Sequence, residues 1–362
     1  MRIYFIVTND LSYDQRMIRI ATSLANNGHT IKLVGRKLNN SISLKVLPFQ
    51  QKRIHCLLNK GKLFYAEYNI RVFFYLLFKK MDCICAIDLD TILPCYFISK
   101  IKKIPRVYDA HELFCEMNEI VSRPRIYNAW KKIEKYSVPK FLKGYTVSQP
   151  IADEFEKMYN VKYEVVRNVA FKKDIQIPEK KGKYLLYQGA VNEGRSFESI
   201  IPAMKLVNAP LIICGEGNFL SQAKKLVSEN EMNEKIIFKG NVVPEELQNY
   251  TLNAWIGINL LADKGLNNYY SLANRFFDYM HAGLPQLCVD LPAYREINEQ
   301  FEIGVLISDL TPENIARQIN ILLEDEDLHQ CLQQNCMRAR EIFNWQNEEK
   351  KLISFYKNIF SG

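Results

Sequence analysis

The sequence predicts an α/β chain built from two Rossmann-like, doubly wound domains. Short apolar runs typical of strands alternate with segments typical of helices along the 362 residues, which is the pattern of parallel sheets. A second series of this kind starts near residue 183, after a polar, lysine-rich stretch over 170–183 that has the composition of a linker. The length is sufficient for two separate cores.

The first series begins with a strand over 2–8 and a helix over 17–27, which Gly28 can end. Further strands are expected over 30–34, 82–87, 106–108 and 145–148. These elements predict an N-terminal domain over 1–172.

The second series predicts a C-terminal domain over 173–340, followed by a last segment over 341–362. Its strands are expected over 184–189, 211–214, 235–239, 255–260, 286–289 and 304–307. Helices are expected over 197–207, 219–230 and 245–249, and a further helix starts at Ser271.

The segment from Tyr269 to Pro285 is the most informative part of the sequence. Ser271 is a residue type that caps helices, and the free N–H groups at a helix start can bind a diphosphate. Asp278 lies seven residues later, so we expect it on the same helix face, where it can accept hydrogen bonds from ribose hydroxyls. This arrangement favours a nucleotide-sugar site. An ordinary amphipathic helix with an Arg275–Asp278 pair explains the same residues equally well.

The charge is unevenly divided along the chain. Residues 1–150 contain 25 Lys and Arg against 11 Asp and Glu, whereas residues 151–362 contain 23 against 29. A basic half can face nucleic acid, anionic lipid or an acidic substrate. Basic and large apolar residues interleave over 60–80, which favours an anionic membrane surface, and no motif for nucleic acid appears. A buried helix with lysine ends in water explains 73–78 equally well.

The nine cysteines include no CxxC pair and no zinc-ligand spacing. Several lie in apolar runs, such as Cys83, Cys85, Cys214 and Cys288, and are interpreted as reduced core residues. The N-terminus lacks the apolar region of a signal peptide, and the apolar run over 72–78 is too short to span a bilayer. We therefore expect a cytoplasmic protein that lies peripherally on the inner face of the membrane.

The segment over 269–285 also resembles the donor-binding helix of retaining GT-B glycosyltransferases, in particular glycosyltransferase family 4. In that family Ser-Leu-Pro-x-Lys-x-x-Glu-Tyr is common before Ala-Gly-Leu-Pro; here Ala273, Arg275 and Asp278 replace the proline, lysine and glutamate. The family's first glutamate corresponds to Tyr270. The resemblance covers nearly the whole chain. It implies a GT-B fold, with two Rossmann-like domains facing a central cleft and residues 341–362 returning to the N-terminal domain.

Three loops before this helix carry the same resemblance. Gly189 and Arg195 match a Gly-Arg-x4-Lys pattern at the diphosphate, with Ala190 in place of the arginine and either Arg275 or a residue of the N-terminal domain as a candidate substitute. The segment 215–217 matches a Gly-x-Gly turn at the donor cleft, and 240–242 matches a segment whose backbone reads the nucleobase. The donor-binding residues that the resemblance implies are Gly189, Arg195, Gly215, Glu216, Gly217, Gly240, Asn241, Val242, Tyr270, Ser271, Leu272, Ala273, Asn274 and Asp278.

The N-terminal half carries three further matches: an Asp-x-Arg-x-x-Arg helix, an Asp-Leu-Asp-Thr segment and an Asp-x-His-Glu strand end. The acceptor-side residues that they imply are Asn9, Asp14, Arg16, Arg19, Asp88, Asp90, His111 and Glu112. The family places His111 near the donor sugar, which makes His111, Arg195 and Asp278 the catalytic candidates. Taken alone, His111 fits an N-cap or a buried structural histidine better.

Asp88-Leu89-Asp90 also matches the DxD metal motif of the other glycosyltransferase fold. A loop-structuring role is favoured, because a helix end and Arg195 already serve the diphosphate, and no metal is expected.

The expected function is transfer of a hexose, with retention and without metal or other cofactor, from a nucleoside-diphosphate sugar to a glycan or lipid-linked acceptor. Polysaccharide biosynthesis is the implied process. The residues at 85, 87, 190 and 270 depart from the family pattern. They leave open a catalytically weakened GT-B scaffold or partner subunit. A GT-B-like sugar-nucleotide epimerase is a third alternative, although the paired acid/base residues that it needs cannot be assembled from the sequence.

Overall fold

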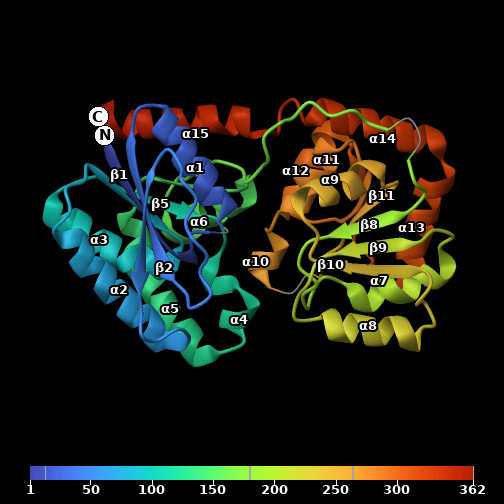
Figure 1. The fold of residues 1–362 in the computed structure, drawn as a ribbon, viewed down its shortest axis with the longest axis horizontal. Coiled ribbons are helices and arrows are strands. Elements are labelled where there is room, and N and C mark those ends of the chain that lie inside the picture. Colours follow the sequence, from blue (N-terminus) through green and yellow to red (C-terminus); the bar gives the residue numbers. More distant parts are fainter. Residues whose placement is uncertain (13, 179–180, 263–264, 362) are drawn as a thin grey trace. The chain divides into compact units, whose positions relative to one another are not determined.

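The computed structural model describes residues 1–12, 14–178, 181–262 and 265–361. The chain forms two compact units: unit 1 comprises Met1–Asn168 and Glu348–Gly362, and unit 2 comprises Val169–Asn347 (Figure 1). The divisions predicted from the sequence lie at 172–173 and 340–341. The whole expected linker over 170–183 falls within unit 2, and its residues 179 and 180 lie outside the described residues.

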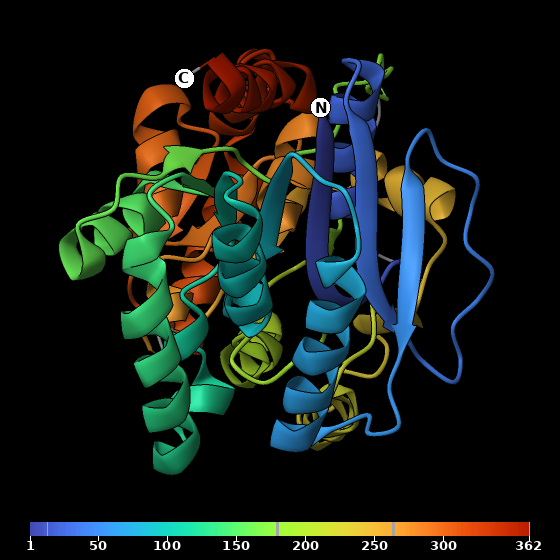
Figure 2. The same ribbon diagram turned by 90° about the vertical axis from the view of Figure 1, so that its left-hand side faces the viewer.

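Unit 1 is built on a parallel sheet with the strand order β3-β2-β1-β4-β5-β6-β7 in its described part. The strands are β1 (Arg2–Asp10), β2 (Thr30–Lys37), β3 (Gln50–His55), β4 (Cys83–Ile87), β5 (Arg106–Ala110), β6 (Gly144–Thr146) and β7 (Glu164–Val165). The helices are α1 (Gln15–Asn26), α2 (Gly61–Leu77), α3 (Ile92–Lys102), α4 (Asn118–Val121), α5 (Pro124–Ser137), α6 (Gln149–Tyr159) and most of α15 (Trp345–Ser361). Figure 2 shows α2, α3 and α5 in front of one face of this sheet.

The core of unit 1 forms because its central strands are covered on both faces. All five residues of β4 are fully buried, as are Ile3, Phe5 and Ile6 of β1, which explains their continuous apolar character. The last helix completes this core, because Tyr356 packs edge-on against Phe5 and Tyr145, with ring centroids 6.0 and 6.3 Å apart.

Unit 2 repeats the architecture with a parallel sheet in the order β10-β9-β8-β11-β12-β13 in its described part. Its strands are β8 (Leu185–Gln188), β9 (Leu211–Cys214), β10 (Ile236–Gly240), β11 (Ile256–Asn259), β12 (Gln286–Val289) and β13 (Gly304–Ile307). Its helices are α7 (Phe197–Ala203), α8 (Leu220–Glu229), α9 (Pro244–Asn253), α10 (Leu266–Tyr269), α11 (Asn274–His281), α12 (Pro292–Phe301), α13 (Pro312–Glu324) and α14 (Glu326–Ala339). Figure 1 shows α7 and α8 on one face and α9 and α11 on the other. The prediction of two doubly wound α/β domains is confirmed.

Helix α2 is apolar on two opposite faces. Phe64, Tyr68, Val72 and Leu76 are buried. A second row at helical spacing faces solvent and continues just past the helix end; we call it the α2 exposed stripe. It consists of Leu63, Ile70, Phe74 and Phe78, which are 59, 57, 57 and 80% exposed. The buried row fits the expectation of a buried helix, whereas the α2 exposed stripe is an apolar surface whose partner stays a prediction.

The cysteines behave as the sequence predicts for core residues. All nine are free, and all except Cys331 are buried. Among the described residues, no helix combines the length and apolar character needed to cross a bilayer.

Candidate functional site

The donor-side residues of unit 2 gather where the strand order reverses. β8 lies between β9 and β11, so the connections that leave β8 and β11 diverge and open a crevice at the carboxyl ends of these strands, the usual ligand position in such sheets. The loop after β8 contains Gly189 and Arg195. It is joined to the loop after β11 by a hydrogen bond from the Ala262 N–H to the Gly194 carbonyl, at 2.9 Å.

Glycines allow the loops after β8 and β9 to pack backbone to backbone. The Gly189 N–H donates to the Cys214 carbonyl at 2.9 Å, and the Val191 N–H donates to the Glu216 carbonyl at 3.0 Å. A Cβ on Gly215 would lie 1.9 Å from the Gly189 carbonyl oxygen, and one on Gly217 would lie 2.3 Å from that of Val191. The predicted residues 189 and 215–217 therefore do form one surface.

The prediction that Ser271 caps the donor helix is wrong. α11 begins at Asn274, after Ala273 in an extended conformation. Ser271 instead ends the short helix α10, and its Oγ donates to the Asn268 carbonyl at 2.9 Å. The reason is that residues 266–269 already form a helical turn, which was not predicted from the sequence. Asp278 consequently lies about one turn from the true start of α11.

Asp278 is held by a chain of side-chain hydrogen bonds. Gln188 donates from Nε2 to Asp278 Oδ2 at 3.1 Å, and its Oε1 accepts from the Thr251 hydroxyl at 2.8 Å. The Gln188 side chain is fixed because the residue is 5% exposed at the end of β8. Sequence reasoning missed Gln188 and Thr251, because no motif includes them.

Asp278, Gln188 and Thr251 line a cavity of about 280 Å³ within unit 2. Val242, predicted at the nucleobase, lines the same cavity. The remaining lining residues are Ala170, Phe171, Lys173, Ile175, Pro244, Leu247, Gln248, Leu252, His281, Ala282 and Arg340. The cavity therefore combines apolar walls with a few oriented polar groups, the common make-up of small-molecule sites.

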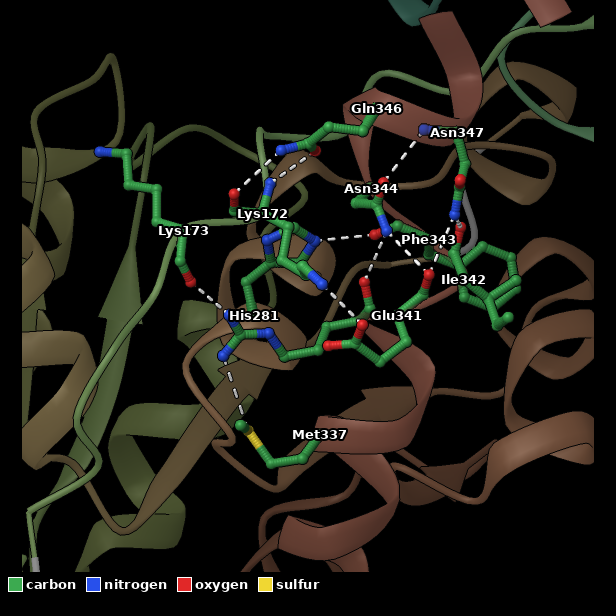
Figure 3. A network of polar contacts seen from close by, with 11 residues as sticks. Lys172, Lys173, His281, Met337, Glu341, Ile342, Phe343, Asn344, Gln346 and Asn347 are labelled. Carbon is green, nitrogen blue, oxygen red and sulfur yellow. Dashed lines mark hydrogen bonds and ion pairs between the residues drawn. The ribbon is translucent and has the colours of Figure 1, made fainter. Parts of the chain in front are cut away.

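A network of polar contacts, shown in Figure 3, fixes one wall of this cavity. His281 contacts the Phe343 carbonyl through Nε2 at 2.7 Å, and the Arg340 guanidinium donates to the Lys173 carbonyl. Lys172 and Gln346 exchange two hydrogen bonds, at 2.9 and 3.0 Å. Burial lowers the pKa of His281, so this histidine is neutral at physiological pH and serves as a structural group.

The Arg275 guanidinium lies beside Gly189, where a Cβ would have Nη1 of Arg275 at 3.8 Å. The Arg275 guanidinium stacks on the Tyr187 ring at 4.4 Å, and its Nη1 donates to the Gln188 carbonyl at 3.1 Å. Burial, and next the charge of Arg275, lower the pKa of Arg195.

Four of the predicted acceptor-side residues of unit 1 also lie near a change in strand order, between β1 and β4. Asp88 and Asp90 follow β4, whereas His111 and Glu112 follow β5. All four line a cavity of about 430 Å³ within unit 1. The other lining residues are Val7, Thr8, Asn9, Arg36, Asn59, Lys60, Gly61, Phe64, Tyr65, Phe114 and Met117.

Burial raises the pKa of three acidic side chains that line this cavity. His111 Nε2 lies 3.0 Å from Asp88 Oδ2, and Asp88 has a positive φ of 56°. Burial, followed by the charges of Glu112 and Asp90, holds the pKa of Asp88 well above its usual range. Burial also raises the pKa of Asp90 and of Glu112 to about 7. Asp90 accepts a hydrogen bond of 2.5 Å from the Thr8 hydroxyl.

The three predicted residues around helix α1 are engaged in other contacts. Asp14 caps α1 and accepts from the Met17 N–H at 3.0 Å. Arg16 forms a buried ion pair with Asp109 at 2.8 Å. Arg19 donates to Asn168 Oδ1 at 2.5 Å. These contacts hold α1 on the sheet of unit 1.

Asp88 and Asp90 were also considered as a metal motif. Over residues 1–12, 14–178, 181–262 and 265–361, no group of three or more His, Cys, Asp or Glu side chains could hold a metal ion. The thiols are also unsuited as nucleophiles where they are buried, since burial raises the pKa of Cys214 to about 11.

The fold defines the class of the protein. Over its full length the chain superimposes on sucrose-phosphate synthase from Thermosynechococcus elongatus with a TM-score of 0.82 at 13% identity, covering 100% of this chain and 99% of that one. It also matches the Anabaena protein Alr3699/HepE, solved in complex with UDP and glucose, with a TM-score of 0.77 at 12% identity over 99% of both chains. The chain has the GT-B fold.

Unit 2 also matches a family model. Residues 169–338 match the family model described as glycosyl transferases group 1. The chain is also 26% identical over 238 residues to an uncharacterized glycosyltransferase of Methanocaldococcus jannaschii. That alignment spans 62% of this chain and 57% of the relative.

Proposed function

We propose that the protein transfers a hexose from a nucleoside-diphosphate sugar to a glycan or lipid-linked acceptor, with retention and without a metal. The observation that carries this proposal is the unit 2 cavity, which places Asp278 and Val242 in one enclosure inside the segment that matches the group 1 family model. The Anabaena protein was solved with UDP and glucose bound, which supports a nucleotide-linked hexose as the donor.

Each part of the donor has a matching group in unit 2. Asp278 would accept hydrogen bonds from the ribose hydroxyls, and Gln188 would keep its carboxylate in place. The nucleobase would lie along Val242, with the backbone of Gly240 and Asn241 beside it. The diphosphate would lie between the start of α11 at Asn274 and Arg195, where positive charge stabilises the leaving group.

The acceptor would enter the cavity of unit 1. Its hydroxyl oxygen forms the new bond to the sugar carbon as the bond from that carbon to the phosphate oxygen breaks, and the departing phosphate takes the hydroxyl proton. This needs no dedicated protein base. His111 and Asp88 would orient the reacting groups, which agrees with their contact at 3.0 Å.

The proposal can be tested with the purified protein and UDP-, GDP-, ADP- and dTDP-sugars. One of them should raise the melting temperature, because ligand binding stabilises the folded state. With this donor and a glycan acceptor, the product anomer determined by NMR should match the donor anomer. An inverted product would refute retention. Donor binding without transfer or hydrolysis would favour the weakened scaffold, for which Ala190 and Tyr270 argue.

We also propose that unit 1 binds anionic membranes through α2. The α2 exposed stripe is flanked by cations at Lys60, Lys62, Lys79 and Lys80, and the one acid of α2, Glu67, is paired with Arg71 at 2.7 Å. Apolar side chains among cations suit the interface of an anionic bilayer, where each basic residue near the surface contributes about 1 kcal/mol. An acceptor on a lipid carrier would then be concentrated near the protein.

Vesicle co-sedimentation tests this surface. Binding to vesicles with phosphatidylglycerol should exceed binding to neutral phosphatidylcholine and should fall with salt. Replacing Phe74 and Phe78 with serine should weaken it, whereas the same replacement of Leu206 and Ile321, exposed apolar residues of unit 2, should not. Equal binding to both vesicle types, or unchanged binding of the Phe74→Ser/Phe78→Ser variant, would refute the proposal.

A further inference from the structure

The cavity of unit 1 has an acidic lining in a half of the chain that is otherwise basic. Asp88, Asp90 and Glu112 all line it, although residues 1–150 contain 25 Lys and Arg against only 11 Asp and Glu. Asp90 is 8% exposed, and the Asp88 side chain is 15% exposed. The gathering of these carboxyl groups is therefore a property of the cavity and does not follow from the composition of this half.

In the described part of the chain, no Lys or Arg side chain lies within ion-pair distance of these three carboxyl groups. His111, which contacts Asp88 at 3.0 Å, stays neutral because burial lowers its pKa. Arg36 also lines the cavity, but its guanidinium stacks on the Phe64 ring at 4.6 Å. Lys60 is exposed just before α2. The three acids therefore face the cavity without a paired positive charge.

Such a cavity disfavours negative charge, on the protein and on a ligand alike. A buried carboxylate without a cation is costly, and burial accordingly raises the pKa of Asp88, Asp90 and Glu112. Oδ1 of Asp88 is buried and has no hydrogen-bond partner among the described residues. A ligand with its own carboxylate or phosphate would add a further negative charge, whereas the hydroxyl groups of a neutral ligand can donate hydrogen bonds to these oxygens.

Aromatic rings line the same cavity. Phe64 and Tyr65 come from α2, and Phe114 follows β5. Trp130 of α5 packs edge-on against both Tyr65 and Phe114, with ring centroids 5.3 and 5.0 Å apart, and so holds these two rings in place. A sugar ring has apolar C–H faces and polar edges, so aromatic rings beside carboxyl groups suit an uncharged sugar.

We infer that the unit 1 cavity selects an acceptor sugar that carries no anionic group, with Asp90 and Glu112 as the residues that exclude uronic acids and sugar phosphates. This inference rests on the proposed function, which places the acceptor in this cavity, and it names the class of acceptor sugar. The sugar hydroxyl groups donate to the carboxyl oxygens while the ring packs on Tyr65 or Phe114. Any negative charge elsewhere on a glycan or on a lipid diphosphate remains outside the cavity.

Matched pairs of acceptors test this selection: methyl glucoside, galactoside and mannoside, each beside the uronic acid that has a carboxylate at carbon 6. Binding to the whole chain is followed by calorimetry and by the fluorescence of Trp130, and Trp130→Phe should lose the fluorescence change. In each pair that binds, the neutral sugar should bind roughly tenfold or more tightly than its uronic acid. Glu112→Gln and Asp90→Asn keep the side-chain size and should narrow this ratio. Glu156→Gln, which changes an exposed glutamate of α6, is the matched control and should not.

A uronic acid that binds the wild type as tightly as its neutral partner would overturn the inference, and so would a wild type that binds none of the neutral sugars. An unchanged ratio in both Glu112→Gln and Asp90→Asn would also overturn it, and either variant is sufficient if the other does not fold. The proposed function is tested separately, by transfer from the donor to the same acceptors. Selective binding of neutral sugars without transfer would refute the proposed function and still support the selection by the cavity.

Discussion

Replacing Asp278 with alanine should weaken donor binding by removing hydrogen bonds to the ribose. In the structure the Asp278 carboxylate lines the unit 2 cavity and receives a bond from Gln188 at 3.1 Å. Hydrogen bonds to a charged group contribute about 1.5–3 kcal/mol. The loss of one such bond to the ribose therefore raises the Kd of the nucleoside diphosphate roughly tenfold to 150-fold.

The assay compares a ribonucleoside diphosphate with its 2′,3′-dideoxy analogue by calorimetry, in the wild type and in Asp278→Ala. The wild type should bind the ribonucleoside diphosphate more tightly than the dideoxy analogue, by roughly tenfold to 150-fold in Kd. The variant should bind both forms with similar affinity. Glu229→Ala, which removes an exposed carboxylate of α8, serves as control and should leave the preference unchanged. Asp278→Asn separates charge from shape, because its amide oxygen can still accept from Gln188.

A folded Asp278→Ala variant that keeps the full preference for the ribo form would refute the placement of the ribose. A similar loss for the ribo and dideoxy ligands would also contradict it, because such a loss would indicate a general change in the cavity.

Four further outcomes are expected. Arg16→Ala should lower the free energy of unfolding by about 3–5 kcal/mol in urea titrations, because it leaves the buried Asp109 carboxylate without its guanidinium partner. The folded Asp90 carboxyl holds its proton up to a pKa of about 7, against 3.8 ordinarily. The wild type should therefore lose stability, by up to about 4 kcal/mol, as pH rises from about 4 to 7, and Asp90→Asn should lack this part of the slope. Asp88→Ala should reduce transfer while the donor Kd, measured separately, stays unchanged. Transfer should persist in EDTA, because arginines and the α11 start supply the positive charge; loss in EDTA that Mg²⁺ restores would contradict this.

The sequence predicted the fold best in segments whose apolar character follows from burial. The central strands of both units are apolar on both faces, so alternation with helices was sufficient to predict two doubly wound sheets. Strands at the edge of a sheet are less apolar, so the sequence indicates them less clearly. β3, with Gln50, Lys52 and Arg53 among its six residues, and the two-residue β7 were not predicted, because their pairing depends on a neighbouring strand.

For the site, the sequence predicted that two of the loops come together, again because packing restricts the residue type. Loops recognised by glycine spacing, at 189 and 215–217, do come together because the glycines are required by close backbone contact. The predicted start of α11 was three residues too early. The turn at 266–269 forms its own helix, and Ser271 donates a hydrogen bond to that helix instead of capping α11. Gln188 and Thr251 were missed since their role depends on which side chains the fold places beside Asp278.

Helix α15 has a consequence for the order in which the protein can be made. Its first residues belong to unit 2, but from Glu348 onward it belongs to unit 1. There the Glu348 carboxylate accepts from the Arg167 N–H at 2.9 Å, and Tyr356 packs on Phe5. These residues follow all of unit 2 in the chain. During synthesis, unit 1 therefore cannot complete its core until the ribosome has finished the whole of unit 2.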